Sequence, residues 1–262
     1  MSNAQKVLVT GSAGRLGRAA VKALTERGHT VIGFDRVATP GLPATQSVIG
    51  TLGDVELLHQ AMAGVQCVIH LAATADDATF PRGEAPDDGD NFLSELVPGN
   101  IIGPYQVLES ARKLKIPRVI LASTGQTVDG HMDAGNTPVT VGVTYKPRYL
   151  YACTKVFLEA LGQVYAVQHG IAVMAVRFGW CPRDVGQVAL IQKSAEDQDV
   201  FLSPGDAGRF FVSCVEAATL PNYSVVYATS HPLHHLQYDL APARRILGWE
   251  PQDHWPTGAE DY

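Results

Sequence analysis

The fold is decided by Val9-Thr10-Gly11-Ser12-Ala13-Gly14-Arg15-Leu16-Gly17, near the start of the chain. Its glycines separate an apolar, β-branched run that predicts a strand over Lys6–Thr10 from a periodic apolar pattern that predicts a helix over Arg15–Arg27. Such a turn needs backbone conformations that glycine adopts at little cost, and without side chains a diphosphate can reach the N–H groups at the helix start. This placement predicts a dinucleotide site. The residues expected to contact the cofactor here are Gly11, Gly14, Arg15, Leu16 and Gly17.

Strand and helix patterns alternate along the first two thirds of the chain. Strands are predicted at Thr30–Asp35, Gln46–Ile49, Cys67–Ala72, Arg118–Ala122 and Ala172–Arg177, and helices at Val55–Met62, Asn100–Leu114 and Tyr149–His169. This alternation is typical of parallel βαβ units with helices on both faces of a sheet. Right-handed crossovers then favour an α/β fold with a doubly wound parallel sheet of the Rossmann type.

The regular pattern fades in the last third, where Pro and polar residues become more frequent. The clearest elements there are helices at Ala207–Thr219 and Asp239–Leu247 and a strand at Ser224–Thr229. We expect a dinucleotide-binding Rossmann domain over residues 1–178. Residues 179–262 are expected to form a small C-terminal subdomain that covers the substrate and is not an independent domain.

The composition narrows the class of protein. With 262 residues, of which 46% are apolar and 18% charged, the chain is typical of an ordinary globular protein. Its net charge of −6 gives no reason to expect nucleic acid or a membrane surface as a partner, and no apolar run is long enough to cross a bilayer. The first residues lack a signal-peptide core, and four scattered cysteines without a Cys-x-x-Cys pair favour a reduced, cytoplasmic compartment.

The acid at the end of the second predicted strand bears on the choice of cofactor. Asp35 stands 24 residues after Gly11. A carboxylate there accepts hydrogen bonds from the adenosine ribose hydroxyls and repels a 2′-phosphate, which favours NAD over NADP. Arg36 stands beside it and can neutralise the carboxylate or meet a phosphate. The alternative for Asp35 is a solvated acid at a strand end.

A second motif, Tyr151-Ala-Cys-Thr-Lys155, lies in the last long predicted helix. Tyr151 and Lys155 are four residues apart, so they share a helix face. A nearby ammonium, like the positive nicotinamide of an oxidised cofactor, lowers the pKa of a phenol, and a phenolate can take a hydroxyl proton while hydride leaves. The alternative is a surface pair without a role, since the spacing is common. Ser123 and Thr124 end the fifth predicted strand, where a hydroxyl can hold the substrate oxygen unless both only cap the strand.

Two segments are expected to be long loops: residues 75–91, rich in Asp, and residues 129–148, rich in Gly, Pro, Thr and Val. Both follow strands at the carboxyl edge of the sheet, where open α/β sheets bind ligands. The acidic segment is either a lid over the site or a solvent-exposed loop, and exposure to solvent is the simpler explanation of its charges. Three histidines between residues 231 and 235 do not have a zinc-binding spacing, so we expect no metal site.

Five motifs follow one another in a fixed order. They are Thr10-Gly-Ser-Ala-Gly-Arg-Leu-Gly17, His70-Leu-Ala-Ala73, Asn100-Ile-Ile-Gly103, Ala122-Ser-Thr124 and Tyr151-Ala-Cys-Thr-Lys155. In this order they resemble the extended short-chain dehydrogenase/reductases, the NAD-dependent epimerase/dehydratase group. The resemblance covers roughly Lys6 to Arg177 and returns at Ala243–Pro251. Within the group, Gly99–Gly103, the Val176–Gly179 strand end with Cys181 and the overall brevity are most similar to the short uronate dehydrogenases.

The resemblance implies a reaction and a role for each matched residue. Uronate dehydrogenases oxidise the anomeric carbon of a hexuronic acid with NAD. Tyr151 would be the base, Lys155 its electrostatic partner and Thr124 the ligand of the substrate oxygen. Asn100 would help to hold the active-site helix, with Leu52 near adenine and Ala72 near the nicotinamide ribose. The cofactor-binding residues outside the glycine-rich turn are then Asp35, Leu52, Ala72, Asn100, Tyr151 and Lys155.

The substrate-binding residues expected on the same basis are Thr74, Ser123, Gln126 and Arg183. A sugar that bears a carboxylate would favour an arginine clamp. Arg183 suits this role better than Arg209 because it stands just past a strand end, and the alternative for either is a surface arginine. Arg177 is expected to be structural, because it ends a buried strand.

Three functions remain open at this point. A sugar or uronate dehydrogenase is favoured, because the short tail leaves little structure to bind a nucleotide diphosphate. The alternatives are a nucleotide-sugar epimerase or dehydratase with tightly bound NAD, and a catalytically silent NAD-binding sensor, which has no need of Tyr151 and Lys155. A dehydratase should carry an Asp/Glu pair where Gly125-Gln126-Thr127 stands. The two long helices after residue 100 resemble those that pair across the dimer interface of this superfamily, so we expect a homodimer.

Overall fold

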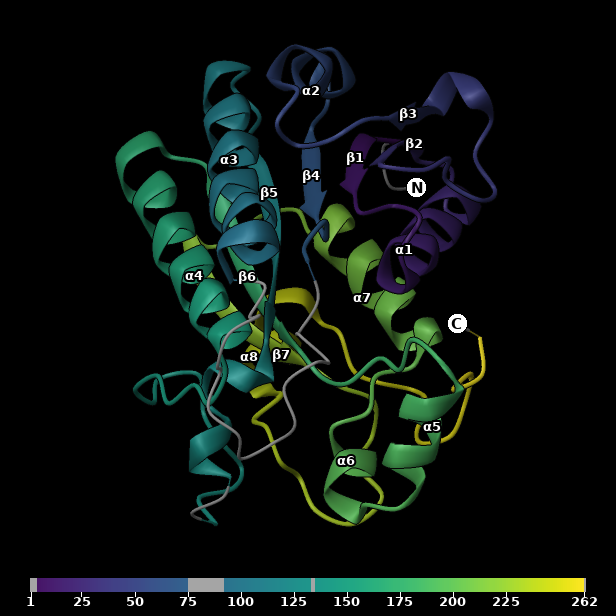
Figure 1. Cartoon of the computed structure of the whole chain (residues 1–262), viewed down its shortest axis with the longest axis vertical. Coiled ribbons are helices and arrows are strands. Elements are labelled where there is room, and N and C mark those ends of the chain that lie inside the picture. The colour runs from purple at the N-terminus through teal and green to yellow at the C-terminus, as the bar shows by residue number, and fades with distance from the viewer. Residues whose placement is uncertain (1–3, 75–91, 133–134, 262) are drawn as a thin grey trace.

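The computed structural model describes residues 4–74, 92–132 and 135–261, so the acidic segment over residues 75–91 lies outside the described residues. Within these ranges seven parallel strands form one sheet in the order β3-β2-β1-β4-β5-β6-β7 (Figure 1). The strands are β1 (Lys6–Thr10), β2 (Thr30–Asp35), β3 (Ser47–Ile49), β4 (Cys67–His70), β5 (Arg118–Thr124), β6 (Ala172–Phe178) and β7 (Tyr223–Ala228). The predicted doubly wound α/β fold is confirmed.

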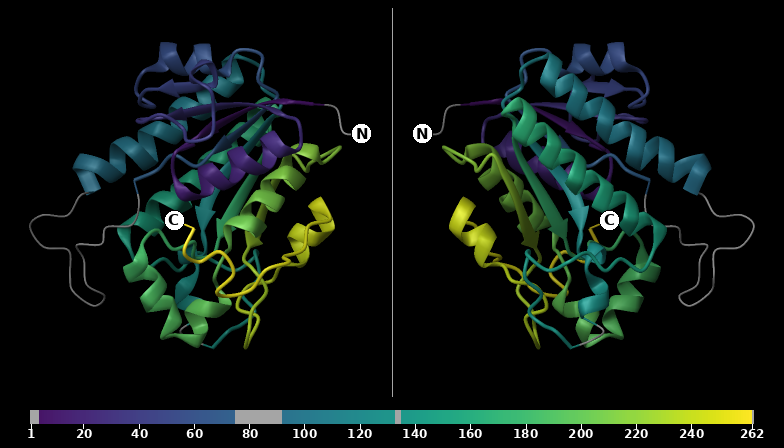
Figure 2. Two further views of the ribbon diagram at one scale, coloured as in Figure 1. Left: turned by 90° about the vertical axis from the view of Figure 1, so that its right-hand side faces the viewer. Right: turned by 90° about the vertical axis from the view of Figure 1, so that its left-hand side faces the viewer.

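Helices cover both faces of this sheet (Figures 1 and 2). One face carries α1 (Arg15–Glu26) and α7 (Pro204–Glu216), and the other carries α2 (Val55–Met62), α3 (Gly103–Lys113) and α4 (Leu150–His169). Successive strand residues point to opposite faces. Val7 and Val9 of β1 therefore join the core beneath α1 and α7, while Leu8 joins the core beneath the other helices. Burial on both faces explains why the strands are continuous apolar runs.

The segment after β6 adds to the sheet and also borders its carboxyl end. β7 pairs with β6, and α7 packs against α1. Two short helices, α5 (Val185–Gln192) and α6 (Ala195–Asp199), lie beyond the carboxyl ends of the strands, and α8 (Ala241–Leu247) contacts β7 (Figure 1). The shorter helical turns are η1 (Ala44–Gln46), η3 (Gly125–Thr127) and η4 (Asp129–His131).

The helix predicted from Asn100 differs from expectation. The chain forms a π-helical segment, η2 (Phe92–Ile102), and then α3. Pro98 lies inside η2 and Pro104 in the first turn of α3, and a proline has no N–H to donate to the preceding turn. The regular hydrogen-bond pattern of one α-helix is therefore interrupted.

Two predicted helices start at other residues than expected. The helix predicted from Ala207 begins at Pro204, because the Ser203 hydroxyl accepts a hydrogen bond from the Asp206 N–H. Asp239, the expected first residue of the last helix, instead precedes it and accepts from the Ala241 N–H at 3.0 Å. Ser203 is thus the N-cap of α7, whereas Leu240, the N-cap of α8, makes no side-chain cap hydrogen bond.

The glycine-rich turn is packed too tightly for side chains. Gly11 has a φ of +69°, and a Cβ atom there would lie 2.6 Å from the Ala72 backbone nitrogen. A Cβ atom on Gly17 would overlap the Gly11 carbonyl oxygen. The turn between β1 and α1 therefore sits directly on the end of β4, with bare backbone facing the carboxyl edge of the sheet.

No helix within the described ranges is both long enough and apolar enough to pass through a bilayer.

Replacement of Gly17 by alanine is expected to destabilise the protein by about 1–3 kcal/mol, because backbone atoms must shift to admit the new methyl group. The same shift should weaken NADH binding. Chemical unfolding and NADH titration measure both effects. Gly142→Ala is the matched control, since a Cβ atom there meets no heavy atom within 4 Å. Equal stability of the two variants would contradict the tight packing of the turn.

Candidate active site

Two adjoining cavities open at the carboxyl ends of the strands. The larger, about 950 Å³, is lined by the ends of β2 and β4 and by η2. The smaller, about 530 Å³, is lined by the ends of β5 and β6, the start of α4 and parts of residues 179–200. The glycine-rich turn contributes Gly11 and Gly14 to both. The turn lies where the strand order reverses between β1 and β4, which is the place where open α/β sheets bind an extended ligand.

The larger cavity contains Asp35, Leu52, Ala72 and Thr74, which the sequence analysis assigned to cofactor or substrate. The Asp35 carboxylate accepts a hydrogen bond from the Ala13 N–H at 3.0 Å, so it is held at the mouth of the turn. Bare glycine backbone next to a fixed carboxylate fits a dinucleotide whose adenosine ribose keeps a free 2′-hydroxyl. The residues present therefore fit NAD.

Arg15, Leu16 and Gly17 line the smaller cavity. Arg15 is only 8% exposed, and its Nη2 donates to the main-chain oxygens of Gly258 at 2.8 Å and Ala259 at 3.3 Å. The first turn of α1 is thus attached to the C-terminal segment, which forms part of the surroundings of the cofactor turn.

Asn100 links the two sides of the larger cavity to α4. It is buried, its Oδ1 accepts from the Thr74 N–H at 2.8 Å, and its Nδ2 donates to the Thr74 carbonyl at 3.0 Å and to Thr154 Oγ1 at 3.2 Å. The Thr74 hydroxyl donates to the Glu95 carbonyl oxygen at 3.2 Å. Asn100 therefore holds the backbone after β4 next to the first turns of α4.

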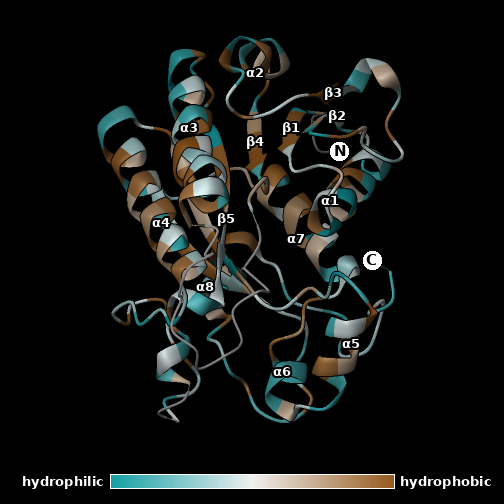
Figure 3. Ribbon diagram, viewed as in Figure 1, coloured by the Kyte–Doolittle hydropathy of each residue, from teal (hydrophilic) through white to brown (hydrophobic). Residues whose placement is uncertain are grey.

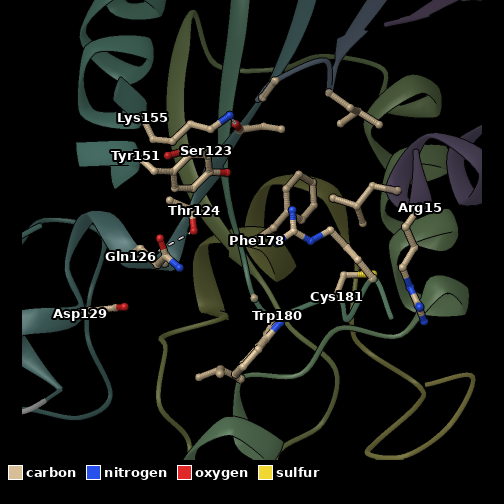
Figure 4. A pocket seen from close by; sticks show the side chains of 18 of the residues that line it. Arg15, Ser123, Thr124, Gln126, Asp129, Tyr151, Lys155, Phe178, Trp180 and Cys181 are labelled. Carbon is tan, nitrogen blue, oxygen red and sulfur yellow. Dashed lines mark hydrogen bonds between the residues drawn. The ribbon is translucent and has the colours of Figure 1, made fainter. Parts of the chain in front are cut away.

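Tyr151, Lys155 and Thr124 meet at the smaller cavity. Figure 4 shows Tyr151, Thr124 and Gln126 on one side of the pocket, Arg15 on the other and Trp180 below. Lys155 Nζ donates to the Ala122 carbonyl oxygen at 2.9 Å and lies 5.4 Å from the centre of the Tyr151 ring. Burial lowers the pKa of Lys155 to about 8. Since this value lies above neutral pH, the ammonium remains mostly protonated there beside the phenol.

A neutral histidine lies behind Lys155. Burial and, to a lesser degree, the charge of Lys155 lower the pKa of His70 to about 3. Its Nδ1 is hydrogen-bonded to Thr10 Oγ1 at 2.7 Å, and the same hydroxyl accepts from the Ala72 N–H at 3.3 Å. His70 thus adds no positive charge beside Lys155 and instead braces the backbone at the end of β4.

The expected substrate residues lie in different surroundings. Gln126 and Arg183 line the smaller cavity, where Arg183 is exposed and its backbone N–H donates to Gln187. Ser123 also borders it, but this side chain is buried and its hydroxyl donates to Glu159 at 2.5 Å. Thr74 belongs to the larger cavity.

Further residues at the smaller cavity were not assigned to it from the sequence. They include Asp129, Arg148, Gln187 and Tyr238. The position of Asp129 and Arg148 in a loop predicted at the carboxyl edge is a sequence signal that could have indicated them. Tyr238 has no local signal, since it arrives through a single bridge with Val139. Across the described ranges we find no group of three or more His, Cys, Asp or Glu arranged for a metal ion.

Comparison with known proteins identifies the family. The model of the NAD dependent epimerase/dehydratase family matches residues 7–180. The chain belongs to this family. Its members use NAD, and the chain is an NAD-dependent oxidoreductase. The resemblance to extended short-chain dehydrogenase/reductases that the sequence motifs indicate is thereby confirmed.

Three relatives show how the family uses this architecture. L-arabinose 1-dehydrogenase (NAD(P)(+)) of Haloferax volcanii is 32% identical over 97% of this chain and 99% of its own length. NAD-dependent glucose-6-phosphate dehydrogenase of the same organism is 28% identical over 95% of this chain and 94% of its own length. The crystal structure of glucuronic acid dehydrogenase from Chromohalobacter salexigens has a TM-score of 0.76 and 27% identity, covering 97% of this chain and 86% of that one.

The buried charge of Lys155 predicts a pH effect on stability. Its pKa is about 8 in the folded protein, against 10.5 ordinarily, so between these values unfolding takes up a proton at this site. The contribution of Lys155 to the free energy of unfolding therefore rises with pH across that window. Lys155→Met should lack the rise.

Urea unfolding of wild type and variant at several pH values between 8 and 10.5 measures this difference. Lys22→Met, which changes an exposed lysine of α1, is the control and should remain parallel to wild type. A constant difference between wild type and Lys155→Met over the window would contradict the depressed pKa.

Proposed function

We propose that the protein oxidises the anomeric hydroxyl of a free sugar or uronic acid to a lactone, with Tyr151 as the base. The observation that carries this proposal is the convergence of Tyr151, Lys155 and Thr124 in a cavity that adjoins the dinucleotide turn. The names of the relatives support a carbohydrate substrate, since all three act on monosaccharides or their derivatives.

The chain's own residues divide the reaction between them. Thr124 holds the substrate oxygen by a hydrogen bond and turns it toward Tyr151. The Tyr151 phenolate takes the hydroxyl proton, and the ammonium of Lys155 stabilises that phenolate electrostatically. Bound NAD would supply the acceptor for the hydride that leaves the anomeric carbon. The products are the lactone, NADH and one proton.

The position of Asp35 supports NAD as the preferred cofactor. Its carboxylate is fixed by the Ala13 N–H, so it cannot readily turn away from a 2′-phosphate on the adenosine ribose. Arg36, the neighbouring cation, is exposed. We therefore expect a higher kcat/KM with NAD than with NADP.

The test is a panel of neutral aldoses, hexuronic acids and sugar phosphates with NAD or NADP, followed by NADH or NADPH absorbance. Wild type should reduce NAD with at least one sugar. Tyr151→Phe should lower kcat by about 10²-fold or more, because the proton acceptor is lost. Tyr105→Phe, at an exposed tyrosine of α3, is the matched control.

Two results would count against the proposal. Full activity of Tyr151→Phe would remove Tyr151 from the role of base. Silence of wild type across the panel, with NAD retained through purification, would instead support an epimerase that returns the hydride to its own substrate.

We also propose that two copies of the chain associate through α4. An apolar stripe with a spacing of three and four residues follows the outer face of this helix. In Figure 3 the α4 ribbon carries hydrophobic colour at several places along its length. Its members are Leu150, Cys153, Phe157, Ala160, Val164 and Val167, all exposed in the single chain. A second copy, related by a twofold axis, would cover this stripe with the same residues.

Val164→Glu should convert the dimer into a monomer, because Val164 is a 53% exposed member of this stripe and its replacement would bury an unpaired charge in the interface. Light scattering after size exclusion measures the mass. Val185→Glu, at a valine of α5 that is 69% exposed, should leave the dimer intact. A monomeric wild type at micromolar concentration would overturn the proposal.

A further inference from the structure

The face of α4 that carries Tyr151 and Lys155 bears a third polar residue at the same spacing. Glu159 follows Lys155 by four residues, so it lies on the helix face turned toward the sheet. It is fully buried. Donors to its carboxylate are Ser123 Oγ (2.5 Å), the Tyr145 hydroxyl (3.0 Å), and Nε and Nη2 of Arg177 (2.9 Å each).

Two side chains of this helix face attach α4 to consecutive residues of β5. Lys155 donates to the carbonyl oxygen of Ala122, and Glu159 accepts from the hydroxyl of Ser123. The next residue of β5 is Thr124, which borders the same cavity as Tyr151. A slide or rotation of α4 along β5 would therefore change the distance between the phenol and the Thr124 hydroxyl.

Arg177 completes this attachment from β6. It is 2% exposed, stands in register with Ser123 on the neighbouring strand, and binds both carboxylate oxygens of Glu159. Desolvation offsets much of the attraction within a buried ion pair, so the pair is weak evidence for stability alone. A bidentate arginine–carboxylate contact does, however, fix orientation strongly. We therefore expect the Glu159–Arg177 pair to fix the orientation of α4 relative to β6 more than to stabilise the fold.

The same pair is connected to the wall of the substrate cavity. Arg177 Nη1 donates to the Tyr227 hydroxyl at 3.0 Å, and the Tyr227 ring stacks on Tyr238 with 4.5 Å between ring centres. The Tyr238 hydroxyl donates to Asp129 at 3.1 Å, and both of these residues line the cavity. A continuous set of contacts thus connects Glu159 and Arg177 to the wall of the smaller cavity.

We propose that Glu159 and Arg177 are positioning residues for catalysis: they set the phenol of Tyr151 against the hydroxyl of Thr124 and steady the Tyr238–Asp129 wall. This inference rests on the proposed function, because it assigns a role within that reaction. Neither residue needs to touch the substrate. A displacement of about 1 Å at the reacting groups can lower the rate by about 10²-fold, which is the scale expected when the pair is removed.

The first test replaces the whole pair. Glu159→Leu combined with Arg177→Met leaves no unpaired buried charge, and such replacements are often tolerated by a fold. We expect a folded protein in which kcat falls by about 10²-fold, the KM for the sugar rises, and the KM for NAD stays unchanged. A folded double variant with wild-type kcat would overturn the proposal.

Conservative variants decide the question if the double variant does not fold. Tyr227→Phe removes the hydroxyl that accepts from Arg177 and donates to the Thr140 carbonyl oxygen at 3.2 Å, and should raise the KM for the sugar several-fold. Tyr223→Phe is the matched control, because the Tyr223 hydroxyl donates to the main-chain oxygen of Glu159 at 2.9 Å and not to its carboxylate. Equal kinetics of both variants would contradict the role of the pair at the wall.

A readout without substrate separates this inference from the proposed function. The ionisation of the Tyr151 phenol can be followed by near-ultraviolet difference absorbance against the same protein carrying Tyr151→Phe. If the pair positions α4 against β5, Ser123→Ala and the double variant should shift the pKa of Tyr151 upward, because the phenol moves away from the Thr124 hydroxyl, a hydrogen-bond donor to the phenolate, while Lys155 moves with the same helix. An unchanged pKa would overturn the positioning role even if no sugar is turned over. Inactivity of wild type with a shifted pKa would reject only the proposed function.

Discussion

The common direction of the strands is the constraint on which the rest of the structure depends. In the described part of the chain every strand of the sheet is parallel to its neighbours, so their carboxyl ends meet at one edge. The glycine-rich turn after β1, Asp35 at the end of β2 and Thr124 at the end of β5 come together there. Both cavities exist because these ends meet at the place where the strand order reverses.

The buried ammonium of Lys155 at this edge carries a desolvation cost. Lys155 is buried against β5, and its lowered pKa shows that the protein disfavours the charged form. Its Nζ donates to the Ala122 carbonyl oxygen, and His70, which lies behind it, is uncharged at neutral pH. In the proposed reaction this ammonium stabilises the phenolate of Tyr151. Its neighbour Glu159 is buried one turn farther along α4 with a full set of donors.

The parts of the site that could be predicted from sequence rest on short-range geometry. Tyr151 and Lys155 share a face in any α-helix, because residues four apart always do. Three glycines between a strand and a helix indicate that backbone segments approach one another closely at that turn. Gly11 packs in this way against the Ala72 backbone, and Gly17 against the Gly11 carbonyl oxygen. The alternation of strand and helix patterns was likewise enough to predict a parallel sheet, because parallel strands are joined by crossover helices that cover both faces.

Sequence by itself therefore determined the class of fold, the cofactor turn and the spacing of the Tyr151–Lys155 pair. Tertiary structure alone decided that Ser123 faces Glu159, that Arg15 reaches the carbonyls of residues 258 and 259, and that Tyr238 borders the cavity. The physical reason is distance along the chain. The local sequence around a carboxylate in a helix or a tyrosine in a loop is the same whether the side chain faces water or a distant arginine. Only the packed structure shows whether such a side chain is buried and which group is its partner.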